Sequence, residues 1–155
     1  MYVNLLVIKS YGITIIMNTD TIGKLTELKV LQYAIERGVL VSIPFGDKER
    51  YDQIWDINGK LFRIQIKTAR PNDEQINSIV FNCRTTYSRK TGSKTHHYNK
   101  NEVDFFATFW DNVCYLIPLD ECGDKKVLRF LSKQNSPNIS WAKDYEFDNI
   151  ISKIY

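Results

Sequence analysis

The sequence lacks a long apolar run, and this shortage excludes a membrane protein. The longest apolar stretches, Tyr2–Ile8 and Ile13–Met17, are broken by Asn4, Lys9 and Gly12 and fall far short of the ~18 apolar residues that a spanning helix needs. No basic residue precedes the first stretch and no small-residue cleavage site follows it, so we expect no secretory signal. We therefore expect an intracellular protein, in the cytoplasm or nucleoid of a bacterium or in an organelle.

Cysteine and histidine are also scarce. The three cysteines, Cys83, Cys114 and Cys122, are an odd number without a CxxC pair, which favours neither a disulfide framework nor a zinc ribbon. Cys83 could join His96 and His97 at a metal, but adjacent side chains seldom converge on one ion. We expect these cysteines to be core or surface thiols.

The remaining composition is that of an ordinary globular domain. The chain has 155 residues, of which 43% are hydrophobic and 25% charged, enough for one buried core. We find no internal repeat, low-complexity tract or linker. We therefore expect a single domain. Its expected bounds are residues 17–155, because Met17 is a second possible start and residues 1–16 could be a dispensable extension.

The net charge of +3 comes from one segment. Residues 75–101 contain five basic residues, both histidines and no acid, which leaves 16 basic and 18 acidic residues in the rest of the chain. Tyrosine, threonine, serine and asparagine lie between these charges, and such side chains contact phosphates and bases. The segment therefore favours nucleic-acid binding, although a solvated loop is the alternative.

The amino-terminal half predicts a helix and then a short strand. Thr19 or Asp20 could cap a helix that runs to Arg37 and ends at Gly38. Its apolar positions at helical spacing are Ile22, Leu25, Leu28, Leu31, Ala34 and Ile35. Residues 39–43 are expected to form a strand that stops at Pro44.

A hairpin follows, and its turn fixes its register. Asn58-Gly59 lies between the strand-like runs 51–57 and 60–68, and this dipeptide is typical of a two-residue type I′ turn. If Ile57 faces Lys60, strand alternation places Asp52 opposite Gln65, with Lys67 on the same face. Three polar groups then converge at one end of the hairpin.

Later segments predict further strands and a tail helix. Residues 78–84, 105–110 and 113–119 resemble strands, the last two joined by a turn at Asp111-Asn112. The basic segment is expected to be a loop between them, at about residues 84–101. Phe147, Ile150, Ile151 and Ile154 indicate a short amphipathic helix.

The polar group on the hairpin is suited to metal-assisted phosphodiester cleavage. Carboxylate and amide oxygens from Asp52 and Gln65 are the hard ligands that Mg²⁺ prefers. Lys67 could orient the attacking water and offset charge on the phosphate, while Glu27 on the helix could hold a second ion or a metal-bound water. The alternative is an exposed hairpin face with ordinary polar residues.

These residues also carry a resemblance to a known family. Glu27, Phe45-Gly46-Asp47, Arg50-Tyr51-Asp52 and Arg63-Ile64-Gln65-Ile66-Lys67-Thr68 resemble the PD-(D/E)XK nuclease superfamily, and more closely its branch encoded in group I introns, the cyanobacterial type of homing endonuclease. The likeness continues at residues 80–82, 104–107, 115–118 and 139–145. It thus spans about Asn18 to Tyr145.

The resemblance implies a fold and a set of roles. The fold is an α/β core with a mixed four- to five-stranded sheet flanked by helices. Asp52 is the metal-binding acid, Gln65 the variable member of the motif, Lys67 the catalytic lysine and Glu27 the helix carboxylate, with the Ile66 carbonyl as a further ligand. The superfamily usually has Asp or Glu where this chain has Gln65, which predicts weaker metal affinity.

The implied function is a Mg²⁺-dependent, sequence-specific double-strand DNA endonuclease of the intron-homing type, for which Mn²⁺ could substitute. Cutting both strands requires symmetry-related sites, so at least a homodimer is expected, and members of this branch look like homotetramers built as dimers of dimers. The expected DNA contacts are Arg84, Tyr87, Arg89, Lys90, Lys94, His96, His97, Tyr98 and Lys100. Arginine suits guanine contacts better than lysine does.

Three alternatives stay open at this point. A Holliday-junction resolvase or a restriction-type nuclease has the same core. A non-catalytic nucleic-acid-binding module on a decayed nuclease core is another, with Gln65 as the mark of decay. A protein-interaction domain that uses the tail helix is the third.

Overall fold

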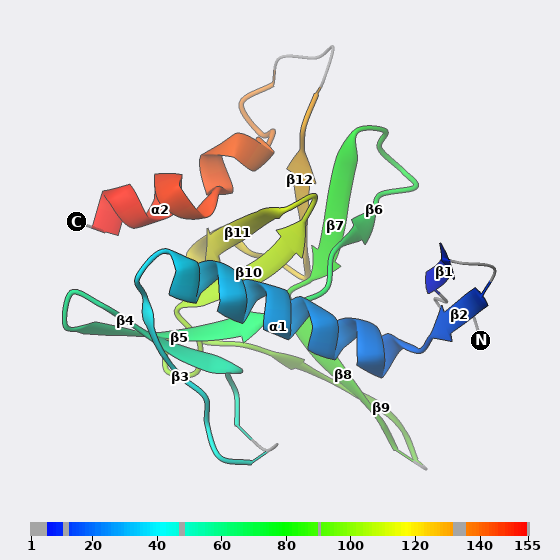
Figure 1. The fold of residues 1–155 in the computed structure, drawn as a ribbon, viewed down its shortest axis with the longest axis horizontal. Helices are drawn as coiled ribbons and strands as arrows, with labels where there is room; N and C mark the ends of the chain where they lie inside the picture. The colour runs from blue at the N-terminus through cyan, green and yellow to red at the C-terminus, as the bar shows by residue number, and fades with distance from the viewer. Residues whose placement is uncertain (1–5, 11–12, 47–48, 90, 132–135, 155) are drawn as a thin grey trace.

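The computed structural model describes residues 6–10, 13–46, 49–89, 91–131 and 136–154. Two helices and a five-stranded sheet are its main elements, and a three-stranded sheet (β12-β7-β6) and two strand pairs (β1-β2 and β8-β9) accompany them (Figure 1). The helices are α1 (Thr19–Glu36) and α2 (Phe147–Ile154), with 3₁₀ turns η1 (Leu119–Glu121) and η2 (Ala142–Tyr145). The strands are β1 (Leu6–Ser10), β2 (Ile13–Met17), β3 (Leu40–Ser42), β4 (Gln53–Ile57), β5 (Lys60–Ile66), β6 (Arg70–Pro71), β7 (Ser78–Asn82), β8 (Arg84–Arg89), β9 (Gly92–His97), β10 (Phe105–Trp110), β11 (Val113–Pro118) and β12 (Lys125–Arg129).

The central sheet is mixed, as predicted for the fold class. Its strand order is β11-β10-β5-β4-β3, and every neighbouring pair is antiparallel except β10 with β5. The three residues 105–107 of β10 lie beside residues 64–66 of β5, so the strand that carries Gln65 is in the middle of the sheet. Helix α1 lies across this sheet and packs on β3, β5 and β10 (Figure 1).

The hairpin β4–β5 has the predicted turn and register. Asn58 and Gly59 have φ of 55° and 78°, which a type I′ turn requires. Ile57 pairs with Lys60 and Trp55 with Phe62. The turn at Asp111 and Asn112, with φ of 48° and 63°, likewise joins β10 to β11 as predicted.

Helix α1 has the predicted extent, but its cap and its buried face differ from the prediction. The cap is Asn18, whose side-chain oxygen accepts a hydrogen bond from the Thr21 amide at 2.8 Å, rather than Thr19 or Asp20. The buried residues are Thr26, Val30 and Ala34.

Three of the predicted core positions of this helix are exposed: Leu25, Leu28 and Ile35. Apolar residues lie all around the helix, so spacing alone could not choose the face that packs. Threonine at position 26 can face the core because its hydroxyl bonds to the Ile22 carbonyl and to Thr68.

The basic segment is a hairpin and not the predicted loop. The predicted strand 78–84 ends at Asn82, and after Cys83 a separate pair forms, β8 with β9, in antiparallel register from Arg84↔His97 to Arg89↔Gly92. This hairpin projects away from the body of the molecule (Figure 1). Its serines, threonines and charged residues lack the apolar alternation that marks a half-buried strand, which is why the sequence did not predict it.

The tail helix is present and packs on the core. Phe147, Ile150 and Ile151 of α2 are buried, and the ring of Phe147 lies 5.6 Å from that of Trp55.

Strand β12, which was not predicted, pairs with β7. No helix in the described part of the chain is long and apolar enough to cross a membrane.

Candidate active site

Asp52 lies directly before β4, at the end of the hairpin that the turn does not close. Its backbone N–H donates to the Ile64 carbonyl at 2.8 Å, which extends the strand pairing by one residue. Its carboxylate oxygen Oδ2 accepts hydrogen bonds from the Ile66 amide and from the Gln65 side chain, both at 2.6 Å. The predicted neighbourhood of Asp52 and Gln65 is therefore confirmed.

Gln65 is buried, with 8% of its surface exposed, and its amide lies between two oxygens. Its Nε2 donates to Asp52 Oδ2 and, at 3.4 Å, to the carbonyl of Ile66. These are two of the oxygens that the resemblance to the nuclease family assigns to a metal ion. A positively polarised N–H₂ group thus lies where carboxylate and carbonyl oxygens converge.

Lys67 follows β5 and points from the same sheet face. Its backbone N–H donates to the Ala107 carbonyl at 2.9 Å, which fixes the chain beside β10. Its ammonium group Nζ donates to Thr85 Oγ1 at 3.1 Å and to the Tyr98 hydroxyl at 3.2 Å. The lysine is close enough to Asp52 for its charge to lower the pKa of that carboxyl group, against the larger effect of burial.

Glu27 approaches the site from α1. The buried side chain of Gln53, the residue after Asp52, donates from Nε2 to the Glu27 carbonyl at 3.4 Å and accepts from Trp55 Nε1 at 2.8 Å, so it joins the helix to β4. Burial raises the pKa of Glu27, and the charge of Asp52 raises it further. Burial also raises the pKa of Asp52, more than its hydrogen bonds and Lys67 lower it.

Strand β5 is also held in place at Arg63, two residues before Gln65. The guanidinium of Arg63 binds both carboxylate oxygens of Asp104 at 2.9 Å and also donates to the carbonyls of Lys100 and Asn101. The Arg63 backbone N–H donates to Asp104 Oδ2 at 2.7 Å. Burial raises the pKa of Asp104, but these bonds outweigh burial and hold its pKa below the ordinary value.

The basic hairpin lies beside this site, and acids from other segments neutralise part of its charge. Asp124 binds Arg84 at 2.6 Å and His97 at 3.4 Å. Asp120 binds Lys100 at 2.7 Å. Counting charges along the segment could not show this, because Asp120 lies 20 positions after Lys100 and Asp124 lies 40 positions after Arg84.

The other predicted DNA contacts are placed differently. His96 contacts Glu102 at 3.1 Å, and the Tyr87 hydroxyl accepts a bond from Arg50 at 3.3 Å. Lys94 is exposed and has no ion-pair partner among the described residues. Only the backbone of Arg89 is described, and Lys90 lies outside the described residues.

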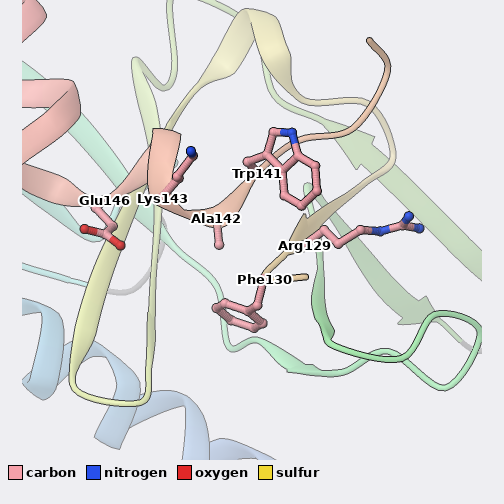
Figure 2. A pocket seen from close by; sticks show the side chains of 6 residues that line it. All are labelled: Arg129, Phe130, Trp141, Ala142, Lys143 and Glu146. Carbon is pink, nitrogen blue, oxygen red and sulfur yellow. The ribbon is translucent and has the colours of Figure 1, made fainter. Parts of the chain in front are cut away.

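Sequence reasoning placed Thr85 in the basic segment but did not predict its bond to Lys67, and it missed the contact of Glu102 with His96. Both contacts depend on how the hairpin folds onto the sheet, and no spacing in the sequence indicates that. Elsewhere, a hollow of about 400 Å³ is lined by Arg129, Phe130, Trp141, Ala142, Lys143 and Glu146, between β12 and η2 (Figure 2). It contains none of the predicted site residues.

The comparisons with known proteins agree with this geometry. The model of the PD-(D/E)XK endonuclease family matches residues 17–148, so the chain belongs to that family and is a DNA endonuclease. The fold is similar to that of a bacterial homing endonuclease, I-Ssp6803I, with a TM-score of 0.73 and 24% identity over 87% of this chain and 94% of that one. The comparison with curated proteins gives no match.

Enzymes of this family typically use divalent metal ions, and the residues here fit such an ion. The oxygens of Asp52 and Ile66 converge on one hydrogen-bond donor, and the charge of Asp52 disfavours ionisation of Glu27. A cation would satisfy both oxygens and relieve this repulsion, and rotating the Gln65 amide by half a turn presents its oxygen instead of its nitrogen. Among the described residues, no three His, Cys, Asp or Glu side chains gather as a metal cluster.

Proposed function

We propose that this enzyme is a Mg²⁺-dependent, sequence-specific endonuclease of the homing type, in a bacterial cell or an organelle, that cuts double-stranded DNA at a long, partly palindromic site. Mn²⁺ is expected to substitute for Mg²⁺. The observation that carries the proposal is the convergence of Asp52, Gln65 and Lys67 at one end of the β4–β5 hairpin, beside a projecting basic hairpin. The similarity to a bacterial homing endonuclease supports it.

Each residue has a role that its position supports. Asp52, Gln65 through its oxygen, the Ile66 carbonyl and Glu27 would hold the ion, which when bound supplies Lewis acidity at the phosphate. Lys67 would position the attacking water and offset the charge that develops on the phosphate. The ends left after cleavage are a 5′-phosphate and a 3′-hydroxyl.

Target recognition is assigned to the basic hairpin β8–β9. Its projecting shape suits a groove of duplex DNA, and a two-stranded ribbon fits the major groove. Among its exposed cations, Lys94 is proposed as a phosphate contact, and Arg84 as a residue that exchanges Asp124 for DNA.

The enzyme is proposed to self-associate, because two DNA strands must be cut. Two strands require at least a homodimer, and our proposal is a homotetramer. Helix α1 leaves Leu28 and Ile35 more than half exposed, and Leu40 of the edge strand β3 is 71% exposed. Exposed apolar side chains and an open sheet edge are features that a partner subunit can cover. Light scattering after gel filtration measures the mass, and a monomer at working concentration contradicts this part of the proposal.

Residues 1–16 are proposed to be dispensable. Strands β1 and β2 pair only with each other in the described part of the chain, and the family match begins at Met17. A chain that begins at Met17 is therefore expected to fold and cut like the full chain. Loss of cutting in that chain, with unchanged circular dichroism, contradicts the assignment.

The test of the proposal is incubation of the purified protein with a pool of random-sequence duplexes, in Mg²⁺ or in EDTA, followed by sequencing of cut ends. Discrete cuts at one motif, present in Mg²⁺ and absent in EDTA, support a sequence-specific enzyme. Cuts without sequence preference contradict specificity. Preference for a four-way junction over linear duplex in a competition assay indicates a Holliday-junction resolvase instead.

A member of this endonuclease family with weakened or lost activity is the second candidate, and Gln65 is the observation that favours it. An amide brings no charge to the metal, and its nitrogen donates to Asp52 in this structure. Binding without turnover in any divalent metal supports this candidate. Recovery of cutting in Gln65→Glu then identifies lost metal charge as the defect.

A further inference from the structure

The ammonium group of Lys67 is held by the basic hairpin and not by the sheet that carries the lysine. Its two hydrogen-bond acceptors are Thr85, the second residue of β8, and Tyr98, the residue that follows β9. The Thr85 and Tyr98 hydroxyls also bond to each other at 2.5 Å. The three groups form a closed triangle, which leaves one N–H of the ammonium group for another partner.

The ring of Tyr98 is itself packed on both sides. The ring of Tyr98 lies edge-on between Phe106 at 5.5 Å and His96 at 5.4 Å, and Phe106 is fully buried and paired with Gln65. His96 in turn contacts Glu102. Thr85 of β8 and Tyr98, directly after β9, therefore both contact Lys67 at the end of the hairpin that joins the rest of the fold. The core residue Phe106 orients the Tyr98 ring.

We propose that Thr85 and Tyr98 are positioning residues that make the placement of the Lys67 ammonium group depend on the placement of the DNA-binding hairpin. This inference rests on the proposed function. A rigid hairpin that shifts when it docks on DNA moves its base, and the ammonium group moves with the hydroxyls that hold it. A target on which the hairpin docks correctly then places Lys67 for cleavage, and a mismatched duplex does not.

This assignment differs from the sequence prediction that Tyr98 contacts DNA. The Tyr98 hydroxyl is directed at Lys67 and Thr85, and its ring also lies under the ammonium group, with Nζ 5.1 Å from the ring centroid. A DNA contact affects binding, whereas a positioning residue affects the rate of the bound complex.

The test uses Tyr98→Phe and Thr85→Val, which keep ring and shape and remove only the hydroxyls. The substrate is the duplex recovered from the random pool, and the single-turnover cleavage rate and the dissociation constant are measured separately. We expect the rate to fall about 10- to 100-fold, as for a misplaced catalytic group, with the dissociation constant within about twofold. The ratio of rates on matched and mismatched duplexes is expected to fall as well.

The chain offers a matched control in Tyr145→Phe. Lys126 Nζ donates to the Tyr145 hydroxyl at 2.9 Å and lies 4.2 Å from the centre of its ring, which repeats the Lys67–Tyr98 arrangement on η2 and β12. This variant loses a lysine–tyrosine bond of the same kind, together with the bond that the Tyr145 hydroxyl donates to Glu121, and is expected to cut like the wild type while it stays folded.

Three outcomes overturn the inference. Unchanged rates in both hydroxyl variants contradict a positioning role, and equal losses of rate and affinity identify Tyr98 as a DNA contact. An equal loss of rate in Tyr145→Phe identifies a general effect of stability. If the wild type itself does not cut, the proposed function fails. If the wild type cuts and Tyr98→Phe cuts equally well, only the positioning role fails.

Discussion

The Arg63–Asp104 pair is expected to be one of the strongest single polar contributions to stability, and Asp104→Asn tests this. The substitution keeps the shape of the side chain but removes its charge and turns one acceptor into a donor that faces Arg63. The carboxylate accepts three hydrogen bonds, two of them from the guanidinium, and both side chains are about 30% exposed.

The magnitude follows from these contacts. A hydrogen bond to a charged group contributes about 1.5–3 kcal/mol, and one bond is lost outright while the others weaken. Since water reaches the pair and screens it in part, we expect Asp104→Asn to lower the free energy of unfolding by about 2 kcal/mol at neutral pH. Urea denaturation followed by tryptophan fluorescence measures the change.

The pH dependence has a definite sign. The folded pKa of Asp104 is below its ordinary value of 3.8, so the stabilisation is complete above that pH and is lost as the pH falls through the folded pKa. The difference between wild type and variant therefore shrinks in acid.

The matched control is Asp120→Asn, at the exposed pair with Lys100, where a change within about 0.5 kcal/mol is expected. Equal effects in the two variants, or a difference for Asp104→Asn that does not shrink in acid, would show that the Arg63–Asp104 pair does not stabilise the fold in this way.

Two further predictions concern the active site and the DNA contacts. Burial raises the folded pKa of Asp52, so its stabilising contribution is complete below the ordinary carboxyl pKa and is lost as the pH rises through the folded pKa. The Asn side chain of Asp52→Asn is neutral at every pH, so this variant is expected to raise the free energy of unfolding in EDTA at pH 7.5 by about 1 kcal/mol. Thermal melts should also show that Mg²⁺ stabilises the wild type but not the variant. A variant that is less stable than the wild type in EDTA contradicts this prediction. Lys94→Ala is expected to weaken binding to all DNA sequences and to reduce the slope of log binding constant against log salt concentration by about one, as measured by fluorescence anisotropy. The control Lys153→Ala, on α2, should leave that slope unchanged. Equal slopes for the wild type and Lys94→Ala contradict a phosphate contact.

The hairpin that carries the candidate site could be predicted because its determinants are local. Asn58-Gly59 fixes both the turn and the register, and the register alone brings Asp52 to Gln65. The resemblance to the nuclease family extended this local result to a mixed four- to five-stranded sheet flanked by helices, but it did not give the strand order.

What could not be predicted depends on contacts between distant segments. The acids Asp120 and Asp124 fold onto the basic hairpin, and Thr85 bonds to Lys67 eighteen positions earlier. The prediction of which face of α1 packs on the sheet was also wrong, because Thr26 can be buried once its hydroxyl has hydrogen-bond partners. None of these interactions has a repeat or a spacing that a sequence pattern could reveal.

The central claim is that Asp52 and Lys67 cut DNA that other residues bind. The most direct measurement compares the wild type with Asp52→Ala and Lys67→Ala for cleavage in Mg²⁺ and for DNA affinity in EDTA, on the duplex recovered from the random pool. We expect cleavage to fall about 100-fold or more in each variant while affinity stays within about threefold. Cleavage that persists, or affinity that falls as far as cleavage does, would contradict it.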